Sequence, residues 1–174
     1  MGSVPAQLAT LAGVIVGTLG SLLIARFTIR QTWSRTADRE LRERRAEAYS
    51  EYMLSLKSKV MTLARKAGLR GVLVRFRPVL GEDLDRALVA AELERASLWE
   101  RVLLVGSAPT LSAAQACNVA AREMEQLLGR EDLDQRHWDD AVVKFKDARR
   151  DFHQAARIDM GVVGAPPKDM SWTW

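Results

Sequence analysis

The uncharged stretch VPAQLATLAGVIVGTLGSLLIA, residues 4–25, runs directly into RFTIR, residues 26–30. No side chain from Met1 to Ala25 is charged, whereas the 20 residues from Arg26 to Arg45 include seven arginines. A helix needs about 20 consecutive apolar residues to cross the hydrocarbon core of a bilayer. We therefore predict a transmembrane anchor over residues 1–30.

Two other interpretations of this stretch are a cleaved secretory signal and a buried helix of a soluble protein. A secretory signal begins with a basic segment, and MGSVPAQ, residues 1–7, has no lysine or arginine. A wholly apolar buried helix of this length seldom lies at a chain terminus and ends in an arginine cluster. Arginines beside a span are retained in the cytoplasm, which predicts a single-pass protein of the cell membrane with its N-terminus outside.

Small residues recur at every fourth position within the predicted span. Such positions form one groove along a helix, and close approach of backbones through small residues drives helix association in lipid. The stripe therefore predicts a homo-oligomer, although small residues are also common in spans that do not associate. Its members are Ala9, Gly13, Gly17, Ser21 and Ala25.

Two groups of side chains are expected to contact the membrane surface. Basic residues next to a span gain free energy from anionic lipid, and tryptophan rings favour the membrane interface. Because a bundle that returns to the membrane would end close to it, the C-terminal tryptophans are candidates too, with a flexible tail over residues 163–174 as the alternative. The candidates are Arg26, Arg30, Arg35 and Arg39 for lipid, and Trp33, Trp172 and Trp174 for the interface.

The remainder of the chain, residues 31–162, has the pattern of an all-α domain. Apolar residues recur at spacings of three, four and seven, and glycine, proline and capping residues separate four segments. Short links favour antiparallel neighbours, so we predict an antiparallel four-helix bundle in the cytoplasm. The expected helices are about 31–67, 82–105, 109–128 and 134–160.

The first of these helices has a clear apolar face. Its expected core positions are Leu41, Ala48, Tyr52, Leu56, Val60, Leu63 and Ala67. The charged residues between them are expected to form a solvated face: Arg39, Glu43, Glu47, Glu51 and Lys59. Cys117, the only cysteine, excludes an intrachain disulfide and is expected to be a small core residue.

The search for an active site finds no motif for catalysis, metal binding or a cofactor. The two histidines, His137 and His153, are sixteen residues apart and lie on different faces of one helix. Acidic pairs such as Asp147 and Asp151 have a basic residue within about a turn, which is typical of surface ion pairs. The sequence thus predicts no enzyme and no cofactor. DNA-binding signatures are also absent, so the basic charge near the span is attributed to lipid.

Three short motifs give the chain a resemblance to a group of proteins. They are RRAEAYSEYM at residues 44–53, RVLLVGS at residues 101–107 and FHQAARIDMGV at residues 152–162. In these motifs and in its glycine-rich anchor, the chain resembles single-span membrane proteins of actinobacteria and actinophages. The resemblance implies the same order of anchor, arginine-rich stalk and helices, and it adds no site residues.

The function expected from these features is a non-enzymatic, membrane-anchored scaffold that self-associates and binds a protein partner. One alternative is a membrane-perturbing factor of phage or of phage defence, acting through assembled anchors. Another is a spanin-like extracytoplasmic coiled-coil protein, which requires the opposite orientation in the membrane.

Overall fold

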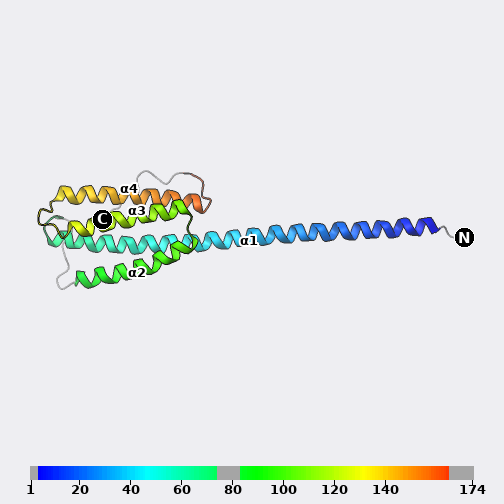
Figure 1. Cartoon of the computed structure of the whole chain (residues 1–174), viewed down its shortest axis with the longest axis horizontal. Coiled ribbons are helices and arrows are strands. Elements are labelled where there is room, and N and C mark those ends of the chain that lie inside the picture. Colours follow the sequence, from blue (N-terminus) through cyan, green and yellow to red (C-terminus); the bar gives the residue numbers. More distant parts are fainter. Residues whose placement is uncertain (1–3, 74–82, 165–174) are drawn as a thin grey trace. The chain divides into compact units, whose positions relative to one another are not determined.

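The computed structural model describes the backbone of residues 4–73 and 83–164 and the side chains of residues 37–73 and 83–164. Four helices account for most of these residues, and no strand occurs among them. Figure 1 labels the helices, which are α1 (Val4–Leu69), α2 (Leu84–Val105), α3 (Ala108–Leu127) and α4 (Gln135–Asp159). The prediction of an all-α chain is confirmed.

The chain divides into two units, residues 1–42 and residues 43–174. The predicted span, residues 1–30, belongs to the first unit, and the side chains of the span lie outside the described part. Within the part of the chain that the structure describes, no helix is both long and apolar enough to cross a membrane. Residues 37–44, on both sides of the boundary at Arg42, are all exposed and are not part of the core.

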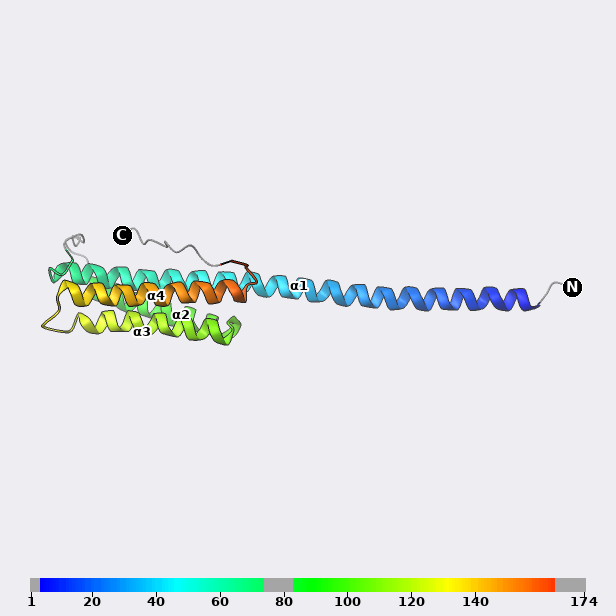
Figure 2. The ribbon, with the colours of Figure 1, turned by 90° about the horizontal axis from the view of Figure 1, so that it is seen from above.

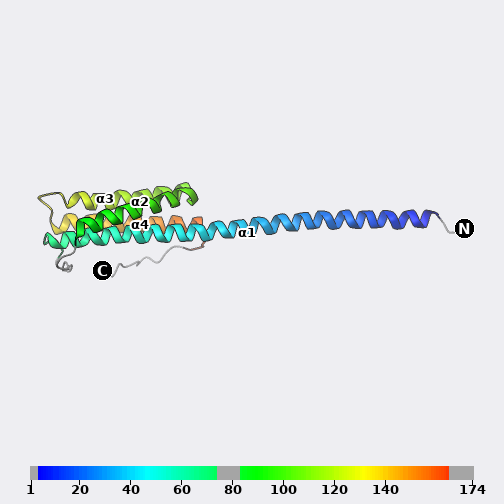
Figure 3. The same cartoon turned by 90° about the horizontal axis from the view of Figure 1, so that it is seen from below.

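The second unit is a helical bundle whose helices run alternately in opposite directions (Figures 1, 2 and 3). Contacts at the two ends of α2 establish its direction relative to α1. Lys66 Nζ lies 2.5 Å from Asp85 Oδ1 at the start of α2, and Arg45 Nε lies 2.7 Å from the Val105 carbonyl oxygen at its end. Helices α3 and α4 pack along each other.

The core of the bundle is built from one face of each helix. From α1 it takes Tyr52, Leu56, Val60 and Leu63, each 0% exposed, at the spacing expected of a helical stripe. The largest side chains facing this stripe from α3 and α4 are Met124, Trp138 and Phe152. Cys117 is fully buried among them, which confirms its expected place in the core.

The prediction that Leu41, the first residue of the expected apolar face, belongs to the core is wrong. It is 40% exposed, while Ala48 is the first residue of α1 that belongs to the core. The helical period continues through both positions, but the bundle begins only at residue 43, so Leu41 lies in the other unit.

The structure joins the predicted span and the first expected helix in one helix, so α1 begins at Val4 rather than near residue 31, and the other helix ends lie within two residues of their expected positions. Two aspartates cap N-termini with their side chains, since Asp83 accepts from the Arg86 N–H and Asp134 accepts from the His137 N–H. Gly161 follows α4 with φ of 72°, the left-handed conformation that favours glycine after a helix.

Candidate functional site

The side chains proposed for membrane contact and oligomerisation fall almost entirely outside the described residues. This holds for Ala9, Gly13, Gly17, Ser21 and Ala25, for Arg26, Arg30 and Arg35, and for Trp33, Trp172 and Trp174. Arg39 is described and is exposed on α1. The described residues instead contain two partly buried polar clusters and one surface groove.

The first cluster, which we call the end cluster, joins all four helices around the carboxylate of Asp159. The Asp159 side chain is 8% exposed, although it is the last residue of α4. Its Oδ2 accepts hydrogen bonds from the Tyr49 hydroxyl, from the Ser107 backbone N–H at 3.0 Å and from the Thr110 hydroxyl at 3.3 Å. Its Oδ1 lies 3.0 Å from Nη1 of Arg45.

Arg45 satisfies carbonyl groups that two helix ends leave without a partner in the helix. Its Nε donates to the Val105 carbonyl at the end of α2, at 2.7 Å. Its Nη1 donates to the Asp159 carbonyl at the end of α4, at 3.0 Å. The positive charge also complements the negative end of each helix dipole. One arginine of α1 therefore caps the C-termini of α2 and α4.

The environment of the end cluster favours the charged form of Asp159. Partial burial would raise the pKa of this carboxyl group, but the hydrogen bonds from Tyr49 and Ser107 and the charge of Arg45 outweigh burial and lower it. Burial and the adjacent Asp159 carboxylate raise the pKa of the Tyr49 hydroxyl above its ordinary value. Tyr49 therefore stays protonated and acts as a donor at every physiological pH.

The three short motifs of the sequence meet in the end cluster. Arg45 and Tyr49 belong to residues 44–53, Ser107 closes residues 101–107, and Asp159 belongs to residues 152–162. The motifs are more than 40 residues apart in the chain, and the contact between Arg45 and Asp159 joins residues separated by 114 positions. A structural role in closing one end of the bundle accounts for Arg45, Tyr49, Ser107 and Asp159 of these motifs.

The second cluster, which we call the central cluster, surrounds Lys59. Lys59 is 5% exposed, and its Nζ lies 2.8 Å from Oε2 of Glu92 on α2 and 2.8 Å from Oε2 of Glu125 on α3. Arg95 donates two hydrogen bonds to Glu92, at 2.9 and 2.6 Å, and a third to Asn118 Oδ1 at 3.1 Å. The cluster links α1, α2 and α3 through charged side chains.

The expectation that Lys59 is part of a solvated face is wrong. The residue lies seven positions after Tyr52 and four before Leu63, so the helical period itself directs it toward the bundle interior. Burial of a lysine is favourable only when carboxylates compensate its lost hydration. Glu92 and Glu125 supply that compensation, and no pattern local to α1 could have revealed them.

Glu92 is the carboxylate that the central cluster perturbs most. The hydrogen bonds from Arg95, together with the ion pair to Lys59, outweigh burial and lower its pKa to about 2. Its side chain is still 40% exposed, so solvent screens these interactions.

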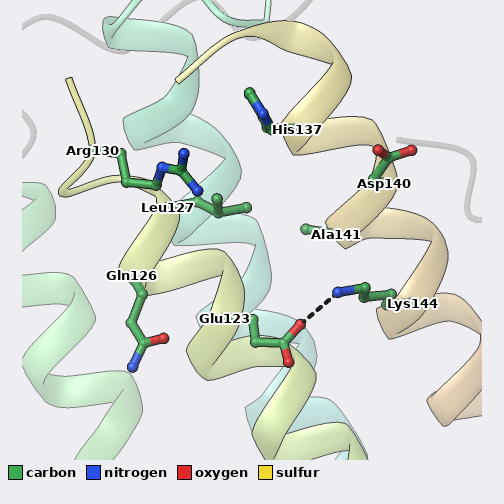
Figure 4. A pocket seen from close by; sticks show the side chains of 8 residues that line it. All are labelled: Glu123, Gln126, Leu127, Arg130, His137, Asp140, Ala141 and Lys144. Carbon is green, nitrogen blue, oxygen red and sulfur yellow. Dashed lines mark hydrogen bonds and ion pairs between the residues drawn. The ribbon is translucent and has the colours of Figure 1, made fainter. Parts of the chain in front are cut away.

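A groove of about 440 Å³ lies on the surface between α3 and α4 (Figure 4). Leu127 and Ala141 give it apolar walls, while Lys144 Nζ donates to Glu123 Oε2 at 3.2 Å across it. Arg130 at its rim is paired with Asp132, with Nη2 and Oδ2 2.7 Å apart. The groove therefore carries both positive and negative side chains, and the cations of Lys144 and Arg130 already have acidic partners. Its lining residues are Glu123, Gln126, Leu127, Arg130, His137, Asp140, Ala141 and Lys144.

Groups that could support catalysis or metal binding are sparse in the part of the chain that the structure describes. No group of three or more histidine, cysteine, aspartate or glutamate residues there has the geometry for a metal ion. Burial raises the pKa of the Cys117 thiol to about 12, so it is not a thiolate at neutral pH. Burial and the neighbouring charge of Arg149 lower the pKa of His153.

Comparison with known proteins adds no homologue: no family model matches the chain, and neither a curated protein nor a solved structure matches it.

Proposed function

We propose that the chain is a membrane-anchored, non-enzymatic scaffold protein that presents a helical bundle to a protein partner in the cytoplasm. Residues 1–30 form the single-pass anchor, with the N-terminus outside the cell membrane. Self-association uses the stripe of small residues in the span, and Arg26, Arg30, Arg35 and Arg39 contact anionic headgroups. The proposal includes interfacial roles for Trp33, Trp172 and Trp174.

The observation that carries this proposal is the uncharged run from Met1 to Ala25 and the seven arginines that follow it up to Arg45. The described part of the chain supports it in one respect. Residues 37–44 are exposed and highly charged, as expected of a solvated stalk between an anchor and a bundle. Arg45, the last of the seven arginines, contacts the ends of α2 and α4 in the bundle.

The polar clusters support the non-enzymatic part of the proposal. In the end cluster the polar atoms of Arg45, Tyr49 and Asp159 contact one another and helix termini. In the central cluster Lys59 and Arg95 are neutralised by glutamates. Charged groups arranged in this way stabilise helix packing, whereas a catalytic group must face a space that a substrate can enter.

Membrane fractionation tests the anchor directly. The full chain should remain in the membrane pellet after carbonate extraction, and Val16→Arg combined with Leu19→Arg should release it, because arginine at the centre of a span costs about 2.5–3.5 kcal/mol. Leu41→Arg is the matched control outside the span and should leave the chain in the pellet. A natural chain that carbonate extracts would overturn the proposal.

The orientation is tested with reporters fused after Trp174. A cytoplasmic reporter should be active and an extracytoplasmic one inactive. The opposite result would favour the spanin-like alternative. Expression without membrane depolarisation is expected of a scaffold, whereas depolarisation would favour the membrane-perturbing alternative.

Self-association through the span is tested by Gly13→Leu with Gly17→Leu. A leucine at these positions prevents close approach of the two backbones, so the signal of a membrane dimerisation reporter carrying residues 1–30 should fall. Leu11→Ala and Leu22→Ala, which leave the stripe intact, are the controls. An unchanged signal in the glycine variant would remove the stripe from the proposal.

A further inference from the structure

The outward face of α2 is unusually apolar for a helix of this bundle. Val89 is 61% exposed, Leu93 68%, Leu103 42% and Leu104 85%, while the inward face of the same helix also consists of apolar residues such as Leu84 and Val102. A helix that packs on one side only is expected to be polar on the other. Exposed apolar residues grouped in this way mark a surface that another molecule covers.

Charged residues on the same face of α2 indicate which molecule covers it. Arg86 and Glu100 lie seven positions before and seven positions after Leu93. At 100° per residue, a step of seven positions returns to within 20° of the starting direction, so the three side chains are nearly in line along α2. The Arg86 side chain is 86% exposed and has only a 3.5 Å contact with the neighbouring Asp83. Glu100 is also exposed.

We propose that this face pairs with the same face of a second copy of the chain, antiparallel and about a twofold axis at Leu93. Each Arg86 then lies opposite Glu100 of the other copy, and Leu93 packs against its own equivalent. A parallel pairing would place Arg86 against Arg86 and Glu100 against Glu100, so charge selects the antiparallel arrangement. A twofold interface of this kind is self-complementary and therefore closes at a dimer.

The inference goes beyond the proposed function because it concerns α2 alone and does not use the span. Since α1 and α2 are antiparallel within the bundle, the Glu43 residues of the two copies lie at opposite ends of the pair.

Oxidative crosslinking distinguishes this antiparallel dimer from a parallel pairing and from random collision. In the full chain, Leu93→Cys should form a disulfide-linked dimer, because the two residues meet at the axis. Leu104→Cys should form none, because the two copies of residue 104 are separated along the helices by about 22 residues, or about 33 Å. Leu104 is the more exposed of the two residues, so crosslinking by random collision would favour it instead.

The crosslinking is done in chains that also carry Gly13→Leu and Gly17→Leu, so that the span stripe cannot bring the copies together. Val143→Cys on α4, at a residue 55% exposed, is a second control and should give no dimer. The natural chain should give none either, because its only cysteine, Cys117, is buried. Equal yields from Leu93→Cys and Leu104→Cys, or no yield from Leu93→Cys, would overturn the proposal.

Charge reversal then tests the register. Arg86→Glu alone places like charges opposite each other twice in the dimer and should weaken association about tenfold in sedimentation experiments. Glu100→Arg alone should do the same. The double variant Arg86→Glu with Glu100→Arg restores both pairs and should associate like the natural chain. A double variant that associates as poorly as each single variant would refute the pairing of these residues.

Discussion

Helices α2 and α4 are similar in length, 22 and 25 residues, but different interactions bind them to the bundle. Helix α4 buries the aromatic side chains of Trp138, Phe145 and Phe152 in the core. The buried residues of α2 are Leu84, Ala91 and Val102, none of them aromatic. Partly buried apolar residues of α2, including Trp99, pack against the edge of the core, and Arg45, Lys59 and Lys66 of α1 add charged contacts.

This difference indicates that the bundle has a strongly packed part and a peripheral helix. Burial of aromatic side chains is the largest favourable contribution that a helix of this size can make. Exposed ion pairs contribute about 0–1 kcal/mol each, and they are screened by salt. We expect α2 to open at a lower free energy than α4, and hydrogen exchange can measure this directly. The apolar outer face of α2 suits a helix that gains its remaining stability from a second copy.

The largest effect is expected from two tryptophans that test the contrast between the helices. Trp138 on α4 is 1% exposed, and Trp99 on α2 packs against the edge of the core beside Tyr52, with ring centroids 5.7 Å apart. Trp138→Ala should lower the free energy of unfolding by about 3–5 kcal/mol, because it leaves a large cavity. Trp99→Ala should lower the free energy of unfolding by clearly less. Urea unfolding of the full chain measures both, and equal losses would contradict the contrast.

A smaller effect is expected from Lys59, the buried cation that joins α2 to α1. Lys59→Met keeps the length of the side chain but leaves Glu92 and Glu125 without their shared cation, which should cost about 1–3 kcal/mol. The matched control is Lys66→Met, whose partner Asp85 is 85% exposed and whose removal should cost about 0–1 kcal/mol. Protection of α2 amides from hydrogen exchange should fall in the first variant only. Equal losses in the two variants would show that burial of Lys59 has no energetic consequence.

The end cluster provides the third test, since it caps α2 and α4 together. Asp159→Asn retains the shape of the side chain but removes its charge from Arg45 and Tyr49, and should cost about 1–2 kcal/mol. The control on the same helix is Asp151→Asn. The Asp151 side chain is 69% exposed, and its Oδ1 makes a long contact of 3.7 Å with Nε of Arg150. Thermal unfolding followed by circular dichroism would compare the two. A cost no greater for Asp159→Asn than for the control would show that the cluster does not stabilise the bundle.

The smallest effect is a dependence of stability on pH that originates in α2. The pKa of Glu92 is about 2 in the folded chain against an ordinary value of 4.5. A carboxyl group with a lowered folded pKa stabilises the fold above its unfolded pKa, and this contribution is lost as the pH falls from 4.5 towards 2. Because Glu92 is 40% exposed, the loss should be on the order of 1 kcal/mol.

Glu92→Gln measures this contribution when urea unfolding is repeated across the same range of pH. The variant should be less stable than the natural chain at neutral pH, and the difference should disappear near pH 2. A difference that stays constant with pH would assign the effect of the substitution to packing. Asp159 also has a lowered pKa, so some dependence on pH should remain in the variant.

Most of the fold could be predicted from local patterns. The apolar stripe of α1 from Ala48 to Ala67 follows the helical period, and Asp83, Asp134 and Gly161 mark helix ends through chemistry that acts within one turn. The candidate clusters could not be predicted in this way. Asp159 is one of many acidic residues in the sequence, and only its contacts with Arg45, Tyr49 and Ser107 distinguish it.

Lys59 shows where local reasoning fails. Its position in the helical period is that of a core residue, but its charge predicts exposure, and the conflict cannot be resolved within α1. The carboxylates that resolve it come from α2 and α3, with Glu92 33 positions further along the chain. The same limit applies to the outer face of α2, whose apolar residues show their exposure only when the other helices are in place.

The amino-acid sequence was sufficient to establish the helical class and most of the helix ends, because these depend on interactions between residues a few positions apart, and it shows the uncharged run before the arginines directly. Tertiary structure was needed to show which charged residues are buried, which helix is peripheral and which side chains close the end of the bundle. Those features depend on contacts between distant residues, such as Arg45 and Asp159, separated by 114 positions. Packing of the four helices brings such residues together, and the local period of each helix carries no information about its partners.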